Sequence, residues 1–276
     1  MLASSKRIEQ SAGRTVFGND ANGYAEGRPD YPARVYDILR TTCRATPSTR
    51  VFEIGPGTGQ ATKRLLDLGC AVTAIEPDNR LAEVLLAKCK SKTPGRLSLH
   101  IAAFEDVDFS DEKFDLGIAA TSFHWLEQES ALAKAKRLLK PGGQWAMWWT
   151  IFGDSSREDE FQRRTRSLFA NLWRSPSHGS ESQVPFALDA ETRKAQLRGA
   201  GFASVSHELI HWTTTQTTSQ VLALTSTFSP VAQLPQTERE ILMKRLERIA
   251  DLEFGGVVAR NFVTVVYTAS CRSDVS

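Results

Sequence analysis

Cysteine is scarce in this chain of 276 residues: its only four are Cys43, Cys70, Cys89 and Cys271. They are scattered, with no Cys-x-x-Cys pair and no zinc-ligand spacing, and the histidines form no ligand set. We therefore expect buried thiols in a reducing compartment, no disulfide framework and no metal site.

Long apolar runs and an excess of charge of one sign are missing as well. No run approaches the ~18–20 residues that cross a bilayer, and the first ten residues contain no apolar signal-peptide segment. With 34 basic and 32 acidic residues, the net charge of +2 argues against a protein built around a polyanion. The sequence predicts a cytoplasmic protein with neither a membrane nor a nucleic-acid partner, and it leaves the oligomeric state open.

What the sequence does contain is an alternation of short β-rich runs with helical patterns. Strands are predicted at 50–54, 71–76, 97–101, 114–119, 144–150, 203–212 and 261–269, and helices at 60–68, 80–89, 130–139, 158–173, 190–198, 216–227 and 236–252. No repeat or flexible linker divides the chain. This pattern favours one α/β domain with an open, doubly wound sheet.

The first predicted strand leads directly into a glycine-rich turn, Glu53-x-Gly55-x-Gly57-x-Gly59. Such a turn lies where an open α/β sheet binds its ligand, because glycine allows positive φ and a close backbone approach. The turn lacks the sixth glycine of a dinucleotide fingerprint, whose place Gln60 takes, and the Gly-Lys-Ser/Thr of a P-loop. A tight turn without a ligand is the alternative interpretation.

Glu76, at the end of the second predicted strand, favours the ligand-binding interpretation. An acidic side chain at this position can accept both hydroxyls of a ribose. The glycine turn and Glu76 together predict a nucleoside site.

These motifs resemble those of a known family. The runs 51–60 and 74–78, with Phe114-Asp115 and Leu138-Leu-Lys-Pro-Gly-Gly143, are similar to the motifs of class I S-adenosylmethionine-dependent methyltransferases. Tyr24-x-x-x-Arg28-Pro-x-Tyr-Pro32 and Phe123-His-Trp-Leu126 resemble the small-molecule ubiquinone/trans-aconitate group. The resemblance implies a Rossmann-like, seven-stranded sheet with a reversed last strand and helical lid segments, and S-adenosylmethionine as cofactor.

The resemblance also implies roles for single residues. Glu53 would orient the methionine amino group directly or through water, Glu76 would bind the ribose, Phe104 would border the adenine and Ala120 would meet the methionine part. The expected cofactor-binding set is Tyr24, Arg28, Glu53, Gly55, Gly57, Thr58, Gly59, Gln60, Glu76, Pro77, Ala103, Phe104, Glu105 and Ala120.

Two segments, the loop after the third predicted strand and the segment that contains Tyr24 and Arg28, need separate interpretation. Many relatives carry an Asp after strand three that binds the adenine amino group, whereas this chain reads Ala102-Ala-Phe-Glu105, so Glu105, Asp106 or the backbone would read the base. Tyr24 and Arg28 suit a sulfonium and a methionine carboxylate, with a proline-rigidified surface turn as the alternative.

His124 follows the fourth predicted strand, where the loop would bring it over the reactive methyl group. We predict that it touches the reacting atom, as a base for a hydroxyl acceptor or as a positioning group for a carboxylate. Phe123, Trp125 and Trp148 are the predicted substrate-binding residues.

The whole chain, 1–276, is expected to be a single domain. It would comprise N-terminal lid helices (1–48), a cofactor-binding core (49–150) and two substrate lid segments (151–200 and 213–258). The predicted reaction is methyl transfer to a small-molecule oxygen, with C-methylation of a quinone-like or polyketide-like metabolite and non-catalytic cofactor binding as alternatives.

Overall fold

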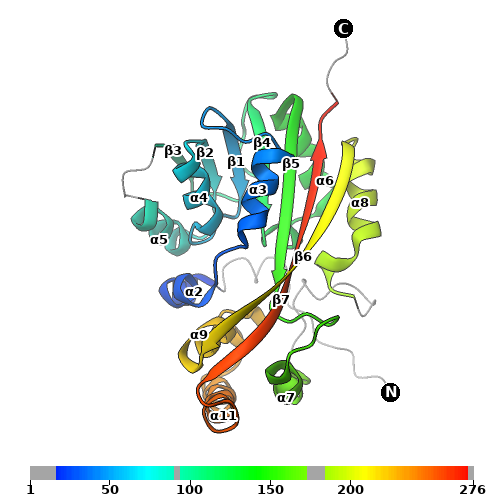
Figure 1. Cartoon of the computed structure of the whole chain (residues 1–276). Helices are drawn as coiled ribbons and strands as arrows, with labels where there is room; N and C mark the ends of the chain where they lie inside the picture. The colour runs from blue at the N-terminus through cyan, green and yellow to red at the C-terminus, as the bar shows by residue number, and fades with distance from the viewer. Residues whose placement is uncertain (1–16, 90–93, 173–183, 273–276) are drawn as a thin grey trace, which may run out of the picture.

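The computed structural model describes residues 17–89, 94–172 and 184–272, which form a seven-stranded sheet flanked by helices (Figure 1). The strand order is β3-β2-β1-β4-β5-β7-β6. β7 is antiparallel to its neighbours β5 and β6, and the other adjacent pairs are parallel. The predicted doubly wound sheet with a reversed last strand is confirmed.

The bounds of the strands follow the alternation of the sequence closely over the first half of the chain. The strands are β1 (Arg50–Ile54), β2 (Ala71–Ile75), β3 (Arg96–His100), β4 (Phe114–Ala120), β5 (Leu139–Ile151), β6 (Ala203–Thr217) and β7 (Val257–Ser270). β1 is buried along almost its whole length, as expected for a parallel strand covered on both faces.

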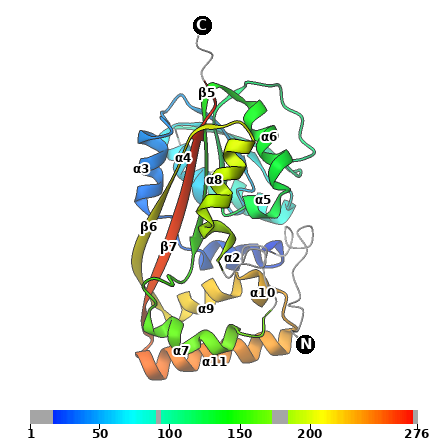
Figure 2. The ribbon, with the colours of Figure 1, turned by 90° about the vertical axis from the view of Figure 1, so that its right-hand side faces the viewer.

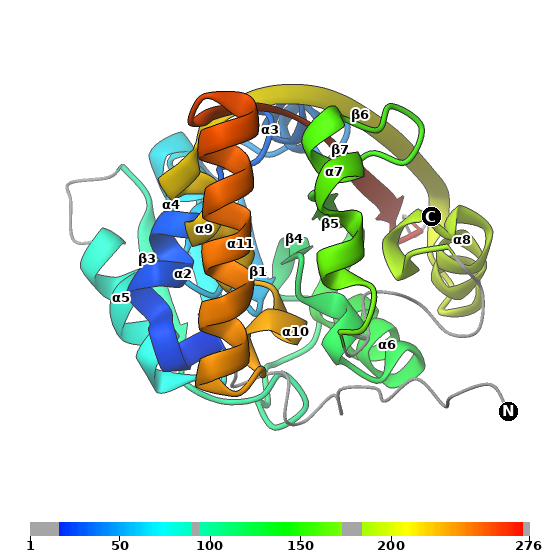
Figure 3. The ribbon, with the colours of Figure 1, turned by 90° about the horizontal axis from the view of Figure 1, so that it is seen from below.

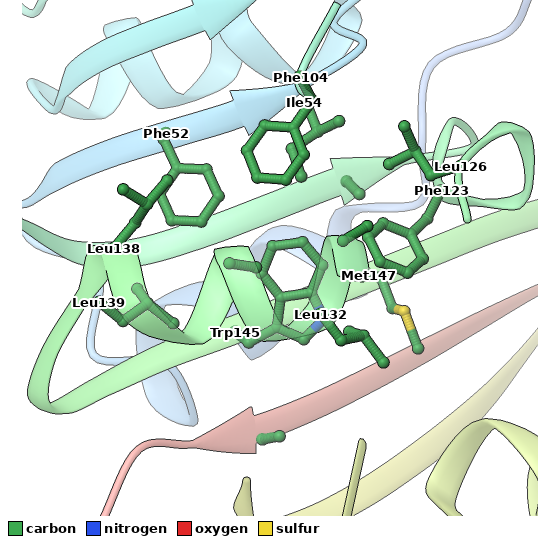
Figure 4. Close-up of a cluster of buried hydrophobic side chains, with 14 of the residues drawn as sticks. Phe52, Ile54, Phe104, Phe123, Leu126, Leu132, Leu138, Leu139, Trp145 and Met147 are labelled. Atoms are coloured by element: carbon green, nitrogen blue, oxygen red, sulfur yellow. The ribbon is translucent and has the colours of Figure 1, made fainter. Parts of the chain in front are cut away.

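Helices cover both faces of the sheet. α3 (Ala33–Thr41) and α4 (Gln60–Leu68) pack on one face, against Val51 and Trp148. α6 (Gln128–Leu138) and α8 (Ala190–Gly199) pack on the other, where Phe52 and Trp145 are central to the core (Figure 4). Trp145 and Trp148 therefore lie on opposite faces of β5, as strand alternation predicts.

β6 and β7 continue past the rest of the sheet as a two-stranded ribbon. Their pairing runs to Thr217 and Val257, whereas β5 pairs with β7 only as far as Val263. The ribbon leads to the helical subdomain, which we define as α7 (Glu160–Phe169), α9 (Thr218–Ser226), α10 (Ser229–Ala232) and α11 (Gln236–Phe254). This subdomain has its own core around Phe161, Val221 and Leu246.

Figures 2 and 3 show the helical subdomain below the sheet, with α2 (Ala21–Gly27) between the two layers. The remaining short or peripheral elements are η1 (Phe17–Asp20), α5 (Asn79–Cys89), η2 (Phe123–Trp125) and η4 (Phe186–Leu188). Gly27 allows α2 to approach α9 closely, because a Cβ atom there would lie 2.2 Å from the carbonyl oxygen of Ala223. No helix within the described residues has the length and apolarity needed to cross a membrane.

Several predicted boundaries differ from the structure. β6 extends beyond residue 212 and β7 begins before residue 261, because the buried positions of these extensions include the polar Gln216 and Arg260 and so show no apolar alternation. The predicted helix 158–173 is shorter, as α7 spans Glu160–Phe169. The run Lys140–Gly143 does not precede β5 but lies within it, at a register shift opposite β4. Most of the predicted loop 175–185 lies outside the described residues.

The predicted lid segments are also divided differently. Within 1–48, α2 lies between the sheet and the helical subdomain, whereas α3 packs on the sheet itself. Within 151–200, α7 joins the helical subdomain, but α8 covers the sheet through Leu197. α3, α7 and α8 bury apolar residues in three different cores, and sequence order alone does not identify which core each one joins.

The tightest packing in β4 yields a stability prediction. A Cβ atom at Gly117 would lie 2.3 Å from Cζ of Phe52 and 2.8 Å from Cε3 of Trp145. We expect Gly117→Ala to lower the free energy of unfolding, measured by urea denaturation, by about 1–3 kcal/mol. Gly199→Ala is the control, because nothing lies within 4 Å of its Cβ position. Equal stability of the two variants would contradict this packing.

Candidate functional site

A pocket of about 950 Å³, its open mouth included, lies at the carboxyl ends of the parallel strands. The chain leaves β1 and β4 towards opposite faces of the sheet, and α/β sheets bind ligands in the crevice that this reversal creates. The pocket has two ends. The β2–β3 end is lined by the glycine turn and by the chain following β2 and β3, and the β4–β5 end by the chain following β4 and β5 together with α2 and its flanking residues.

The glycine turn has the backbone conformation that the sequence predicts. Gly55, Gly57 and Gly59 have φ values of +61°, +58° and +86°. A Cβ atom at Gly55 would clash with Ser122, at 2.7 Å, whereas at Gly57 it would meet only the Tyr24 ring, at 3.9 Å. Gly57 is therefore the glycine whose missing side chain leaves room in the pocket itself.

Glu76 ties the end of β2 to the glycine turn. Its carboxylate accepts the backbone N–H of Gly57 at 2.9 Å and that of Asp78 at 3.0 Å. The side chain is 3% exposed, and burial raises its pKa to about 7 despite these two hydrogen bonds. Glu76 lines the pocket with its acceptor oxygens held in place.

Glu53 lies behind the turn and does not line the pocket. It is fully buried, and its Oε2 accepts a hydrogen bond from the Thr62 hydroxyl at 2.6 Å. Its Oε1 has no hydrogen-bond partner. Burial, together with the nearby Glu76 carboxylate, raises its pKa to about 7. An unpartnered buried carboxylate oxygen suits a ligand donor reached through water, such as an amino group.

The loop after β3 is held in place by a lysine that sequence analysis missed. Nζ of Lys134, on α6, donates to the carbonyl oxygens of Phe104, Glu105 and Val107, at 2.5–2.9 Å. The ammonium group also lies 5.1 Å from the centre of the Phe104 ring. Lys134 thereby fixes the shape of the loop where the adenine-binding residues were predicted.

The β4–β5 end is aromatic and carries one guanidinium group. Phe17 contacts both Tyr24 and Trp125, with ring centroids 5.2 and 6.0 Å apart. Arg28 donates to the side-chain oxygen of Thr227 at 2.7 Å and to its carbonyl oxygen at 3.0 Å. These bonds link the pocket wall to the helical subdomain.

Thr121, between β4 and η2, holds an unusual backbone conformation in the pocket wall. Its φ is +57°, which is rare for a β-branched residue. Its N–H donates to the Trp148 carbonyl oxygen at 2.7 Å, and its hydroxyl lies 3.1 Å from that of Tyr31. Strained backbone is often found at functional sites, and here it lies in the wall at the β4 end of the pocket.

His124 lies behind the pocket and does not line it. It is 5% exposed, and its Nδ1 accepts a hydrogen bond from Nε1 of Trp149 at 2.9 Å. Burial lowers its pKa to about 3. The ring is therefore neutral at physiological pH and is shielded by its neighbour Trp125, which does line the pocket.

The structure brings most of the predicted residues together. The predicted residues that line the pocket are Tyr24, Arg28, Gly55, Gly57, Gln60, Glu76, Pro77, Ala103, Phe104, Glu105, Ala120 and Trp125. Those that do not are Glu53, Thr58, Gly59, Phe123, His124 and Trp148. Phe123 and Trp148 are fully buried in the cores on opposite faces of the sheet, so neither lies where a substrate contact was predicted.

Several lining residues are not in the predicted set. They are Phe17, Pro29, Tyr31, Ile54, Pro56, Ile75, Leu81, Thr121, Ser122, Leu126, Thr150 and Phe152. Thr150 and Phe152 had a usable signal, since they lie at the carboxyl end of a parallel strand. Among the described residues, no group of three or more His, Cys, Asp and Glu side chains is placed to hold a metal ion.

Comparisons with known proteins agree with this geometry. Residues 52–147, which span β1 to β5, match the methyltransferase domain family. An uncharacterized methyltransferase of Geobacillus sp. (strain WCH70) is 30% identical over 152 residues, covering 53% of this chain and 67% of that protein. An uncharacterized methyltransferase of Mycobacterium tuberculosis is 30% identical over 133 residues, covering 48% of this chain. The chain spans 51% of the length of this mycobacterial relative.

A solved structure shares the fold at low sequence identity. Phosphoethanolamine N-methyltransferase 2 of Haemonchus contortus, in complex with phosphomonomethylethanolamine and S-adenosylhomocysteine, is 13% identical with a TM-score of 0.57. The match covers 95% of this chain and 60% of that one.

The two carboxyl groups predict how adenosyl-ligand binding depends on pH. Glu53 and Glu76 each have a pKa of about 7, and a ligand that donates hydrogen bonds favours their ionised forms. The affinity for S-adenosylhomocysteine should therefore rise as the pH increases through 7, by up to about tenfold per pH unit for each carboxyl that must lose its proton.

Calorimetry in buffers of different ionisation enthalpy measures both the affinity and the protons released. Glu76→Gln should bind more weakly and release fewer protons. An affinity independent of pH between about 5.5 and 8 would contradict the raised pKa values.

Proposed function

The chain belongs to the class I S-adenosylmethionine-dependent methyltransferases, and we propose that it transfers a methyl group to an oxygen atom of a small-molecule acceptor, a carboxylate or a hydroxyl. One observation carries the proposal: a single pocket joins the glycine turn and Glu76 at one end to an aromatic wall at the other. Carbon methylation of a quinone-like or polyketide-like metabolite and non-catalytic binding of the cofactor are the alternatives.

At the β2–β3 end, the chain's own groups suit the adenosine part of the cofactor. Glu76 would accept the ribose hydroxyls with the lone pairs that its two bonds to backbone N–H groups leave available. Gly57 leaves space for the ligand, and the loop fixed by Lys134 would border the adenine through Ala103, Phe104 and Glu105. Unpartnered Oε1 of Glu53 would take the amino group through water.

At the β4–β5 end, the chain would align the acceptor and exclude water. The bound cofactor supplies an electrophilic methyl group on a positively charged sulfur. The faces of Tyr24 and Trp125 suit that charge, and Ala120 leaves room beside it. Alignment and desolvation lower the barrier of such a displacement without requiring covalent chemistry from the protein.

His124 takes a positioning role in this proposal. Its Nδ1 is occupied by Trp149, and its pKa of about 3 makes it a poor proton acceptor. Its ring centroid lies 4.8 Å from that of Trp125, with the two planes tilted by 41°, so it can act on the acceptor through that ring. The earlier prediction that His124 touches the reacting atom is the competing hypothesis.

Labelled cofactor tests the proposal directly. The protein is incubated with methyl-labelled S-adenosylmethionine and a metabolite extract, and we expect label in a small molecule. Gly57→Val should abolish transfer and S-adenosylhomocysteine binding, because the branched side chain would occupy the ligand space, while circular dichroism shows a folded protein. Micromolar NAD binding with no heat from either adenosyl ligand would contradict the proposal, as would wild-type affinity in Gly57→Val.

Steady-state kinetics separate the two roles of His124. As a positioning residue, His124→Asn should raise KM for the acceptor and leave the pH profile flat between about pH 6 and 8, measured at saturating cofactor so that the pH dependence of cofactor binding does not contribute. Trp149→Phe removes the N–H that donates to His124, and Trp149 does not line the pocket. This variant should show the same rise in KM and the same flat pH profile as His124→Asn. A loss of about 10²–10⁴-fold in kcat, with activity that falls as the pH drops, would instead show a general base.

A further inference from the structure

The charged groups of the pocket are distributed unevenly between its two ends. Among the described lining residues, the acidic ones are Glu76 and Glu105, which follow β2 and β3. β1 lies between β2 and β4, so even Glu76 is separated from the β4 end by two strand spacings, roughly 10 Å. Arg28 is the only charged residue among those described at the β4–β5 end.

Among the lining residues that the structure describes, the β4–β5 end also has no group suited to remove a proton. Its described lining contains no His, Lys, Asp, Glu or Cys. Burial raises the pKa of the Tyr31 phenol far above neutrality, so that hydroxyl stays protonated and bonded to Thr121. His124, behind the wall, is bonded to Trp149 and is a weak base. A hydroxyl acceptor of ordinary pKa would lack a proton acceptor here.

Arg28 is held as a fixed cation at this end. Two bonds to Thr227 orient its guanidinium group, which lies 4.8 Å from the centre of the Phe152 ring and 5.1 Å from that of Tyr24. A guanidinium between aromatic faces suits an anionic group attached to a flat, apolar body. Thr150 and Ser122 add hydroxyl groups to the same wall.

We infer that the acceptor is a small carboxylic acid with a planar, apolar body, which reacts as its carboxylate with Arg28 facing its charge. The inference rests on the proposed methyltransferase function and deepens it. A carboxylate oxygen forms the new bond to the methyl carbon while the carbon–sulfur bond breaks, and its electron pair remains on sulfur. The products are a methyl ester and a neutral thioether. No proton is released, so no base is needed. The negative charge of the carboxylate and the positive charge of the sulfonium are both lost in the reaction, and a desolvated site favours that loss.

The chemistry of the transferred label tests this inference. The wild-type protein is incubated with methyl-labelled S-adenosylmethionine and a metabolite extract, and the products are treated with alkali. Methyl esters release volatile labelled methanol, whereas ethers, N-methyl and C-methyl groups do not. We expect volatile label, and we expect it to disappear when the extract's carboxylates are first converted to methylamides. Base-stable label would overturn the inference and leave the proposed function standing, whereas no transfer at all would contradict the proposed function.

Variants of Arg28 supply a second test with a binding readout. Benzoate should raise the melting temperature of the S-adenosylhomocysteine-loaded protein, whereas benzyl alcohol and benzamide should not. Arg28→Gln should lose this shift and raise KM for the acceptor about 10–100-fold at saturating cofactor, and Arg28→Lys should partly restore both. Arg245→Gln, which removes an exposed cation on α11, is the control.

Because Arg28 is also a candidate for the methionine carboxylate, the affinity of each variant for S-adenosylhomocysteine is measured separately. A rise in melting temperature with benzyl alcohol equal to that with benzoate would overturn the inference. An Arg28→Gln variant with an unchanged KM for the acceptor would also overturn it.

Discussion

The hydrogen bond from Gly57 to the Glu76 carboxylate joins two parallel strands at the edge where the pocket lies. It fixes the glycine turn relative to the end of β2, and the buried Glu53 lies just beneath. The arrangement places two carboxyl groups with raised pKa values in a region of low polarity. In the absence of a ligand, that burial disfavours their ionised forms. A ligand that brings its own donors compensates for this cost, so the same contacts that shape the turn also select what binds there.

The parts of the fold that the sequence predicts best are the short parallel strands in the first half of the chain. The predicted bounds of β1 to β4 agree with the structure to within one residue at each end, although β1 is almost fully buried and β3, at the edge of the sheet, is only partly buried. The ribbon formed by β6 and β7 was predicted too short, since the buried positions of its outer part include the polar Gln216 and Arg260, so no alternation of apolar residues marks it in the sequence. The division of the lid helices between two cores depends on contacts between distant parts of the chain, which local patterns do not encode.

The candidate site shows the same limit at the level of single residues. The glycine turn, Glu76 and the loop at Phe104 follow from local motifs, because each must meet the ligand with its backbone or at a strand end. Which way a side chain points after a strand is a different matter: His124 turns behind the wall while its neighbour Trp125 lines the pocket. Trp148 likewise faces the opposite core, where its ring meets Tyr31 edge-on. No local motif points to Lys134, because it holds the loop after β3 by donating to three carbonyl oxygens that are distant from it in sequence.

The β6–β7 ribbon has an evolutionary consequence. It carries α9, α10 and α11 as one insertion between two strands whose own pairing holds their ends together. The insertion can therefore be lengthened, shortened or replaced without disturbing the order of the sheet or the glycine turn, because its two attachment points stay in register. Thr227, which orients Arg28, belongs to this exchangeable part, whereas Glu76 directly follows β2 of the sheet. Descendants of one such fold can thus diverge in what they modify while inheriting the glycine turn and Glu76 unchanged.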